Sequence, residues 1–121
     1  MRKRLNDVDR AMAAQAILAI DTFWAEIFSQ TQLNDLNYCD LFTQMWLQRK
    51  VKLPKTELYS FMPNISQRTA VKYVQRAIDE GMLEVCDCKQ DRRVKLISLS
   101  ADCQARVKRF LDYTCKTFSH D

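Results

Sequence analysis

The sequence predicts a mainly α-helical protein with a small β-hairpin, folded as a single domain over residues 1–121. Its 121 residues include only one glycine and two prolines, so few sharp turns interrupt it. Apolar residues recur at helical spacing over most of its length. The exceptions are two short runs rich in apolar and β-branched residues, 82–88 and 94–99, which indicate the hairpin. A chain of this length buries roughly 65% of its unfolded surface, enough for a core without disulfides.

Four helices are expected before the hairpin, and the first three each have their own pattern. Residues 6–32 have an apolar face wider than a single stripe, which indicates contact with both the domain and a second subunit. Residues 36–48 and the short segment 54–62 each present one apolar face to the core. The wide apolar face of the first segment consists of Met12, Ala16, Ile17, Ile20, Phe23, Trp24, Ile27 and Phe28. The residues expected to face inward in the other two segments are Leu36, Cys39, Phe42, Met45, Trp46, Leu58 and Phe61.

The clearest helix is expected over residues 67–80. Ser66 suits its N-cap and Gly81 the position just after its end. Its apolar face consists of Ala70, Val71, Val74, Ala77 and Ile78, and its polar face of Gln67, Arg68, Thr69, Lys72, Tyr73 and Arg76. A turn at 63–66 separates it from the short helix, and the small Ala70 allows the two helices to cross closely. This arrangement is a helix-turn-helix.

The last helix is expected over residues 100–118, with Ser100 as its N-cap and Asp102 in its first turn. Together these elements predict a winged helix-turn-helix with long N- and C-terminal helices. In such a fold the second helix of the pair enters the DNA major groove, and the hairpin tip reaches the minor groove. Residues 66–121 hold 11 basic and 8 acidic side chains, whereas residues 1–65 hold 8 and 7. Basic charge therefore concentrates in the half that would bind DNA.

The predicted DNA contacts follow from side-chain chemistry. Amide and hydroxyl groups hydrogen-bond base edges, guanidinium groups bind guanine or phosphate, lysine adds positive charge, and a tyrosine contacts a phosphate or a thymine methyl group. The predicted contacts are Ser66, Gln67, Arg68, Thr69, Lys72, Tyr73, Arg76, Lys89, Arg92 and Arg93.

Residues 66–71, 80–84 and 91–100 resemble the MarR-type winged-helix transcription regulators. In that family an Asp-x-Arg at the wing tip precedes a Leu-Thr or Leu-Ser that enters the next helix; here Asp91 and Arg93 match, followed by Leu99 and Ser100. The resemblance implies that Arg93 enters the minor groove and that Asp91 orients the wing or a basic neighbour. It also implies a homodimer formed through residues 1–35 and 100–121, with the helix-turn-helix and wing at 54–99.

Members of that family bind small aromatic effectors between the dimer helices and the DNA-binding lobe, so such an effector is a candidate ligand here. They usually continue through a further C-terminal helix that completes an intertwined dimer, and this sequence ends at Asp121 without one. The resemblance therefore does not give the geometry of the dimer.

Composition argues against an enzyme. Gly81 is the only glycine, and P-loops, dinucleotide-binding loops and nucleophile elbows each need several. The single histidine, His120, is the penultimate residue, so a catalytic triad or a multi-histidine metal site would be centred on the chain end. We therefore expect no catalytic residues, no metal site and no cofactor.

Cysteine usage and hydropathy indicate a cytoplasmic protein. The basic start at 2–4 and the apolar run at 11–20 look like a signal peptide, but Asp7 and Asp9 interrupt the basic region and Asp21 stands at the cleavage position. No apolar stretch reaches the roughly 18 residues of a membrane span, so we expect no membrane partner. The odd number of cysteines favours free thiols. They are Cys39, Cys86, Cys88, Cys103 and Cys115.

Three alternatives stay open. Cys86 and Cys88 form a Cys-x-Cys pair, which binds metal or reacts with oxidants in some proteins, although free thiols are favoured here because a bridge across a strand is strained. Cys39, beside Tyr38, is a candidate peroxide sensor. The winged helix also suits a protein-interaction module without sequence-specific DNA binding. The favoured interpretation is a homodimeric, sequence-specific regulator that binds double-stranded DNA, acting as a transcriptional repressor.

Overall fold

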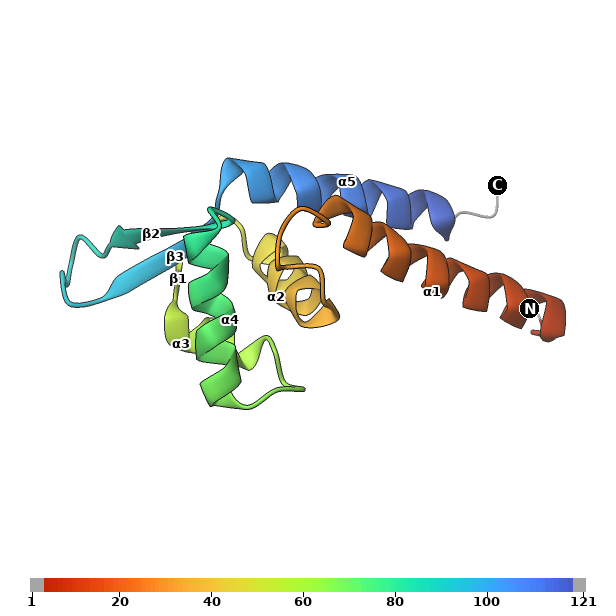
Figure 1. Ribbon diagram of the computed structural model, residues 1–121, viewed down its shortest axis with the longest axis horizontal. Coiled ribbons are helices and arrows are strands. Elements are labelled where there is room, and N and C mark those ends of the chain that lie inside the picture. Colours follow the sequence, from red (N-terminus) through yellow and green to blue (C-terminus); the bar gives the residue numbers. More distant parts are fainter. Residues whose placement is uncertain (1–3, 119–121) are drawn as a thin grey trace.

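A computed structural model describes residues 4–118 and has the mainly helical class with one small sheet that the sequence predicts (Figure 1). Its elements in chain order are α1 (Asp7–Ile27), α2 (Leu36–Leu47), β1 (Leu53–Pro54), α3 (Lys55–Ser60), α4 (Gln67–Asp79), β2 (Leu83–Asp87), β3 (Lys95–Leu99) and α5 (Ala101–Thr117). His120, and the ends of the predicted dimer segments at residues 1–3 and 119–121, lie outside the described residues. No helix within residues 4–118 is long and apolar enough to cross a bilayer.

The elements form two parts that meet at α2. Figure 1 shows α1 and α5 side by side and antiparallel, with the start of α1 and the end of α5 at the same end of the molecule. The second part holds α3, α4 and an antiparallel sheet in the order β1-β3-β2. The β2–β3 hairpin is the predicted wing, and it projects away from the free ends of α1 and α5.

The start of α1 agrees with the prediction, but its end does not. Asn6 and Asp9 form a capping box at its N-terminus, each side chain accepting a hydrogen bond from the other's backbone N–H. The predicted helix ran to residue 32, whereas α1 ends at Ile27. The hydroxyl of Thr31 donates to the Phe28 carbonyl at 2.7 Å and accepts from the Leu33 N–H at 2.9 Å. This local turn ends the helix and directs the fully buried Leu33 inward.

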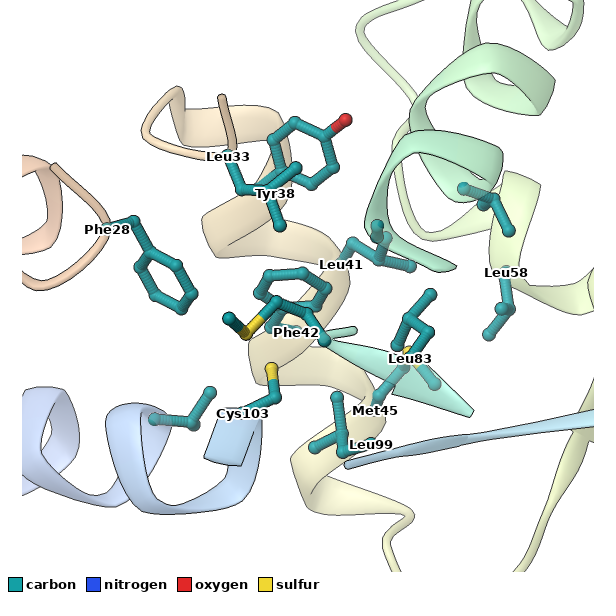
Figure 2. Close-up of a cluster of buried hydrophobic side chains, with 14 of the residues drawn as sticks. Phe28, Leu33, Tyr38, Leu41, Phe42, Met45, Leu58, Leu83, Leu99 and Cys103 are labelled. Carbon is teal, nitrogen blue, oxygen red and sulfur yellow. The ribbon is translucent and has the colours of Figure 1, made fainter. Parts of the chain in front are cut away.

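The core is built around α2, as Figure 2 shows. The ring of Phe42 lies against those of Trp24 and Phe28, with centroids 6.2 and 5.7 Å apart. One inward assignment on this helix was wrong, because Leu36 is 51% exposed, whereas Tyr38 is fully buried. Leu36 lies on the side of α2 opposite the buried residues Tyr38, Leu41, Phe42 and Met45, because successive helix residues are about 100° apart.

The first half of α1 leaves apolar side chains uncovered within the described chain. Met12 and Ile17, which belong to the wide apolar face predicted for this helix, are exposed, as are Val8 and Leu18. Trp24 and Ile27, near the end of the helix, are buried instead. The excess apolar surface predicted for this helix is therefore present, and it lies on the part of α1 that extends beyond the core.

Two substitutions on α2 test this account of the core. Phe42→Ala should lower the free energy of unfolding by about 3–5 kcal/mol, because it removes a fully buried aromatic ring. The control, Leu47→Ala, removes a side chain that is 65% exposed and should change it by less than about 0.5 kcal/mol. Urea denaturation measures both, and equal losses from the two variants would contradict the assigned core.

Candidate nucleic-acid interface

The helix α4 begins and ends where the sequence predicts. The Ser66 hydroxyl oxygen accepts a hydrogen bond from the Thr69 N–H at 3.1 Å, which satisfies a free donor of the first turn. At the other end Gly81 has a φ of +79°, in the left-handed region that other residues adopt only with strain. The chain then turns directly into the hairpin.

The buried stripe of α4 is narrower than predicted. Ala70, Val74 and Ala77 are buried, at positions i, i+4 and i+7. Val71 was assigned to the same face, but it is 43% exposed. Successive side chains of a helix point about 100° apart around its axis, so Val71 lies on the flank of the stripe that contains Ala70. The exposed residues of this helix are Gln67, Arg68, Val71, Lys72, Gln75, Arg76 and Asp79.

Sequence reasoning therefore missed Val71 and Gln75 as members of the exposed face. The spacing of 67, 68, 71, 72 and 75 carries the signal, because residues three and four apart lie on one side of a helix. Gln75 donates its amide hydrogen to Asp79 at 2.9 Å. We call the exposed surface formed by Gln67, Arg68, Val71, Lys72, Gln75 and Arg76 the α4 face.

The basic residues of the α4 face have no acidic partner within the described chain. Arg68, Lys72 and Arg76 are exposed, and none forms an ion pair with a carboxylate of residues 4–118. No ion pair within residues 4–118 therefore neutralises the positive charge of these three side chains on the helix surface. Such a surface attracts anions, and a nucleic-acid backbone is the most extended of these.

Tyr73 is tied to the start of α2 by hydrogen bonds. Its hydroxyl donates to the Asp35 carboxylate at 2.6 Å, and the Tyr38 hydroxyl donates to the Tyr73 carbonyl at 3.0 Å. The two tyrosine rings stack with centroids 4.7 Å apart. The hydrogen bond to the Asp35 carboxylate raises the pKa of Tyr73 above its usual value. Contact between Tyr73 and DNA stays a prediction, while the structure gives this side chain a role in positioning α4.

The wing tip is organised by Asp91. Its carboxylate accepts the Arg93 backbone N–H at 3.0 Å and the Arg93 guanidinium at 3.2 Å. The hydrogen bonds from the Arg93 side chain and from its backbone N–H both lower the pKa of Asp91, and the side-chain bond has the larger effect. The Arg93 side chain is still 91% exposed, and Lys89 and Arg92 are exposed beside it. Asp91 thus holds a basic neighbour, as the resemblance implied.

Short backbone contacts connect α4 to the wing and to α5. The Met82 N–H donates to the Ala77 carbonyl at 3.0 Å, and the Ser100 N–H donates to the Met82 carbonyl at 2.9 Å. Nearer the tip of the hairpin, Asp87 at the end of β2 forms an ion pair with Lys95, its partner at the start of β3. Hydrogen bonds therefore join the end of α4, the base of the β2–β3 hairpin and the start of α5.

The cysteines give no support to a reactive centre at Cys39. Burial raises the pKa of Cys39 to about 11 and that of Cys103 to about 12. Thiols with such values hold very little of the nucleophilic thiolate at neutral pH. Among residues 4–118, no three His, Cys, Asp or Glu side chains lie together as a metal site would require.

A groove of about 560 Å³ lies where α1, α2 and α5 meet the end of α3. Its walls include Ile20, Cys39, Thr43, Leu111 and Phe118. Most of this lining is apolar, with a few polar side chains along one wall. It lies between the long helices and the segment that follows α3.

The helix-turn-helix, the β2–β3 wing and the flanking long helices define a winged-helix fold of the type found in transcription regulators. No protein-family model and no curated protein matches the sequence. Solved structures do match it, and they are winged-helix regulators of the MarR family at low sequence identity. The predicted fold is thereby confirmed.

One such neighbour is a mutant of MepR from S. aureus bound to an oligodeoxyribonucleotide, with a TM-score of 0.72 and 12% identity over 95% of this chain and 79% of that chain. Another is BpsR from Bordetella bronchiseptica, whose DNA binding is regulated by 6-hydroxynicotinic acid, with a TM-score of 0.54 and 17% identity over 100% of this chain and 86% of that chain. The match to AdcR from Streptococcus pyogenes covers 64% of this chain and only 57% of that chain, with 20% identity and a TM-score of 0.49.

The positioning role of Tyr73 is testable by removing one oxygen. Tyr73→Phe should lower the free energy of unfolding by about 1.5 kcal/mol, near the low end for a hydrogen bond to a charged group, because Asp35 is partly exposed. Tyr59→Phe, whose hydroxyl has no hydrogen-bond partner among residues 4–118, should change it by less than about 0.5 kcal/mol. Equal effects in urea denaturation would argue against the Asp35 contact.

The same contact makes stability depend on pH. The folded-state pKa of Tyr73 is raised above the ordinary value of 10.0. Its hydrogen bond to Asp35 therefore contributes fully to the free energy of unfolding below pH 10, and this contribution is lost as the pH rises through the raised pKa. Wild type should therefore lose more stability than Tyr73→Phe between about pH 9 and about pH 11. An identical decline in both proteins would contradict this.

Thiol reactivity tests the burial of Cys39 and Cys103. A rise in pKa from 9.0 to about 11 leaves the folded protein with about 100-fold less Cys39 thiolate than the unfolded chain. Alkylation by iodoacetamide near neutral pH, mapped by mass spectrometry, should be slower at both residues in the folded protein than in urea. Equal rates in the folded and unfolded protein would refute the protection.

Proposed function

We propose that this protein is a sequence-specific regulator of transcription that binds double-stranded DNA, and that it is not an enzyme. The observation that carries the proposal is the α4 face, whose basic residues have no acidic partner among the described residues, together with the exposed Arg93 on a wing fixed to the same helix. A polar, basic helix beside a basic hairpin fits the major groove and the adjacent minor groove of one duplex.

The proposal assigns separate tasks to the residues of this interface. Gln67, Arg68 and Thr69 lie at the start of α4 and would read base edges, with Ser66 preceding them at the N-cap. Lys72 and Arg76 would bind phosphate or guanine. Tyr73 would meet the duplex with its ring rather than its engaged hydroxyl. On the wing, Arg93 would enter the minor groove while Lys89 and Arg92 bind the backbone, and Asp91 would orient Arg93.

We further propose that the protein acts as a homodimer and a repressor. The uncovered apolar side chains of α1, among them Val8 and Met12, support a second copy that packs on α1 and α5. The dimer would span residues 1–35 and 100–121, with the DNA-binding unit at 54–99. A symmetric dimer implies a pseudo-palindromic operator with half-sites about one helical turn apart. Such a dimer would repress transcription by occupying the promoter that contains its operator.

A small aromatic effector is the ligand we propose for the groove between α1, α2 and α5. Its mostly apolar lining, with Thr43 and Gln44 on one wall, suits a flat ring that carries one or two polar groups. The similarity to BpsR, whose DNA binding is regulated by 6-hydroxynicotinic acid, supports this ligand class. The proposed function also implies a cytoplasmic protein, in which its five cysteines would be free thiols.

Selection of binding sequences from random duplex DNA tests the proposed function. The purified protein should enrich a palindromic sequence, and the spacing of its halves gives the dimer symmetry. Low-salt binding without enrichment of any sequence would contradict the proposal, and would favour a winged helix that uses its basic surface to bind an acidic protein.

The wing has its own prediction. Arg93→Ala should weaken binding to the selected operator and to unrelated DNA alike, and should reduce the slope of log affinity against log salt by roughly 1.8 per dimer, as expected when each of the two subunits loses one cationic contact to DNA. Lys50→Ala, which removes an exposed basic side chain in the turn after α2, outside both the proposed dimer segments and the DNA-binding unit, is the control and should leave both quantities unchanged. If Arg93→Ala behaved like this control in titrations at several salt concentrations, the wing would not bind DNA.

A further inference from the structure

An apolar side chain belongs to the α4 face, on the flank that borders the buried stripe. Val71 is 43% exposed, one turn after Arg68 and next to Lys72, both of which are also exposed. Every other member of this face carries a hydrogen-bonding or charged group. Val71 therefore stands among the residues that the proposed function directs at DNA, and it offers neither a hydrogen bond nor a charge.

Neither core packing nor helix formation accounts for a valine at this position. The buried stripe of α4 is completed by Ala70, Val74 and Ala77. Valine forms helices less readily than alanine, lysine or arginine, because its branched side chain is restricted against the preceding turn. What the residue supplies is a pair of methyl groups held in one rotamer on the outer surface of the helix.

Only one base presents a complementary group. In the major groove thymine carries a C5 methyl group, whereas adenine, guanine and cytosine present hydrogen-bond donors and acceptors. A helix seated in that groove contacts base edges with residues near its N-terminus, and Val71 lies one turn after Gln67, the first residue of α4. Removal of two facing apolar surfaces from water favours the contact without any hydrogen bond.

We propose that Val71 is a specificity-determining residue that packs against the C5 methyl group of one thymine in each operator half-site. This inference rests on the proposed function and deepens it, because it names a base and the atom that is read. The neighbours Arg68 and Lys72 then bind the groups that flank this thymine, and Val71 discriminates against cytosine at the same position.

A double-mutant cycle between protein and DNA tests the contact. Each thymine of the selected operator is replaced in turn, in one half-site, by deoxyuridine, which lacks only the methyl group. Affinities are then measured for wild type, Val71→Ala and a control, Val85→Ala. Val85 is also 43% exposed but lies on β2 rather than on α4. Because alanine favours helix more than valine does, Val71→Ala should not unfold α4, and thermal unfolding verifies this.

Wild type and Val85→Ala should lose about fourfold in affinity at one deoxyuridine position per half-site, the value that corresponds to ~0.8 kcal/mol for one buried methyl-sized group. Val71→Ala should bind the original operator more weakly and lose less than about twofold at that same position. Equal losses for Val71→Ala and wild type at every thymine would overturn the inference, as would an operator without thymine in its half-sites. Failure to enrich any operator would instead refute the proposed function itself.

Discussion

The orientation of α4 depends on one carboxylate. Asp35 accepts the Asn37 N–H at 2.8 Å at the start of α2 with one oxygen and the Tyr73 hydroxyl with the other. Tyr38, fully buried in the core around α2, donates to the Tyr73 carbonyl and stacks on its ring. Contacts along the side of α4, and not only the turns at its ends, thus fix this helix to the core.

This attachment explains how a small domain can present a rigid surface of one charge. The buried stripe of α4 uses small residues, Ala70 and Ala77, so its backbone lies close to its neighbours. Its outward side is then free to carry basic groups without acidic partners, which stabilise no part of the fold and are useful only to a ligand. Gly81 permits the sharp turn into the wing, and the Asp91–Arg93 pair organises the tip.

Local signals in the sequence were enough to predict most elements. The caps at Ser66 and Ser100, the turn at Gly81 and the two hairpin strands rich in apolar and β-branched residues all depend on residues near one another in the chain. The sequence therefore predicts them directly. Two residues were assigned to the wrong side of a helix. Val71 lies on the flank of the buried stripe of α4, about 100° around the helix from Ala70, and Leu36 lies on the side of α2 opposite its buried residues Tyr38, Leu41, Phe42 and Met45. The contacts of Asp35 and Tyr73 join residues 38 positions apart, and periodicity carries no information about such pairs. The assignment of individual DNA contacts stays a prediction for the same reason.

The central claim is that the α4 face and the wing tip together form the DNA-binding surface. Chemical-shift mapping of the ¹⁵N-labelled protein, titrated with the duplex that it selects, tests this most directly. We expect the largest chemical-shift changes to cluster at residues 66–76 and 89–93. Changes confined to α1 and α5, with residues 66–76 unaffected at saturating DNA, would contradict it.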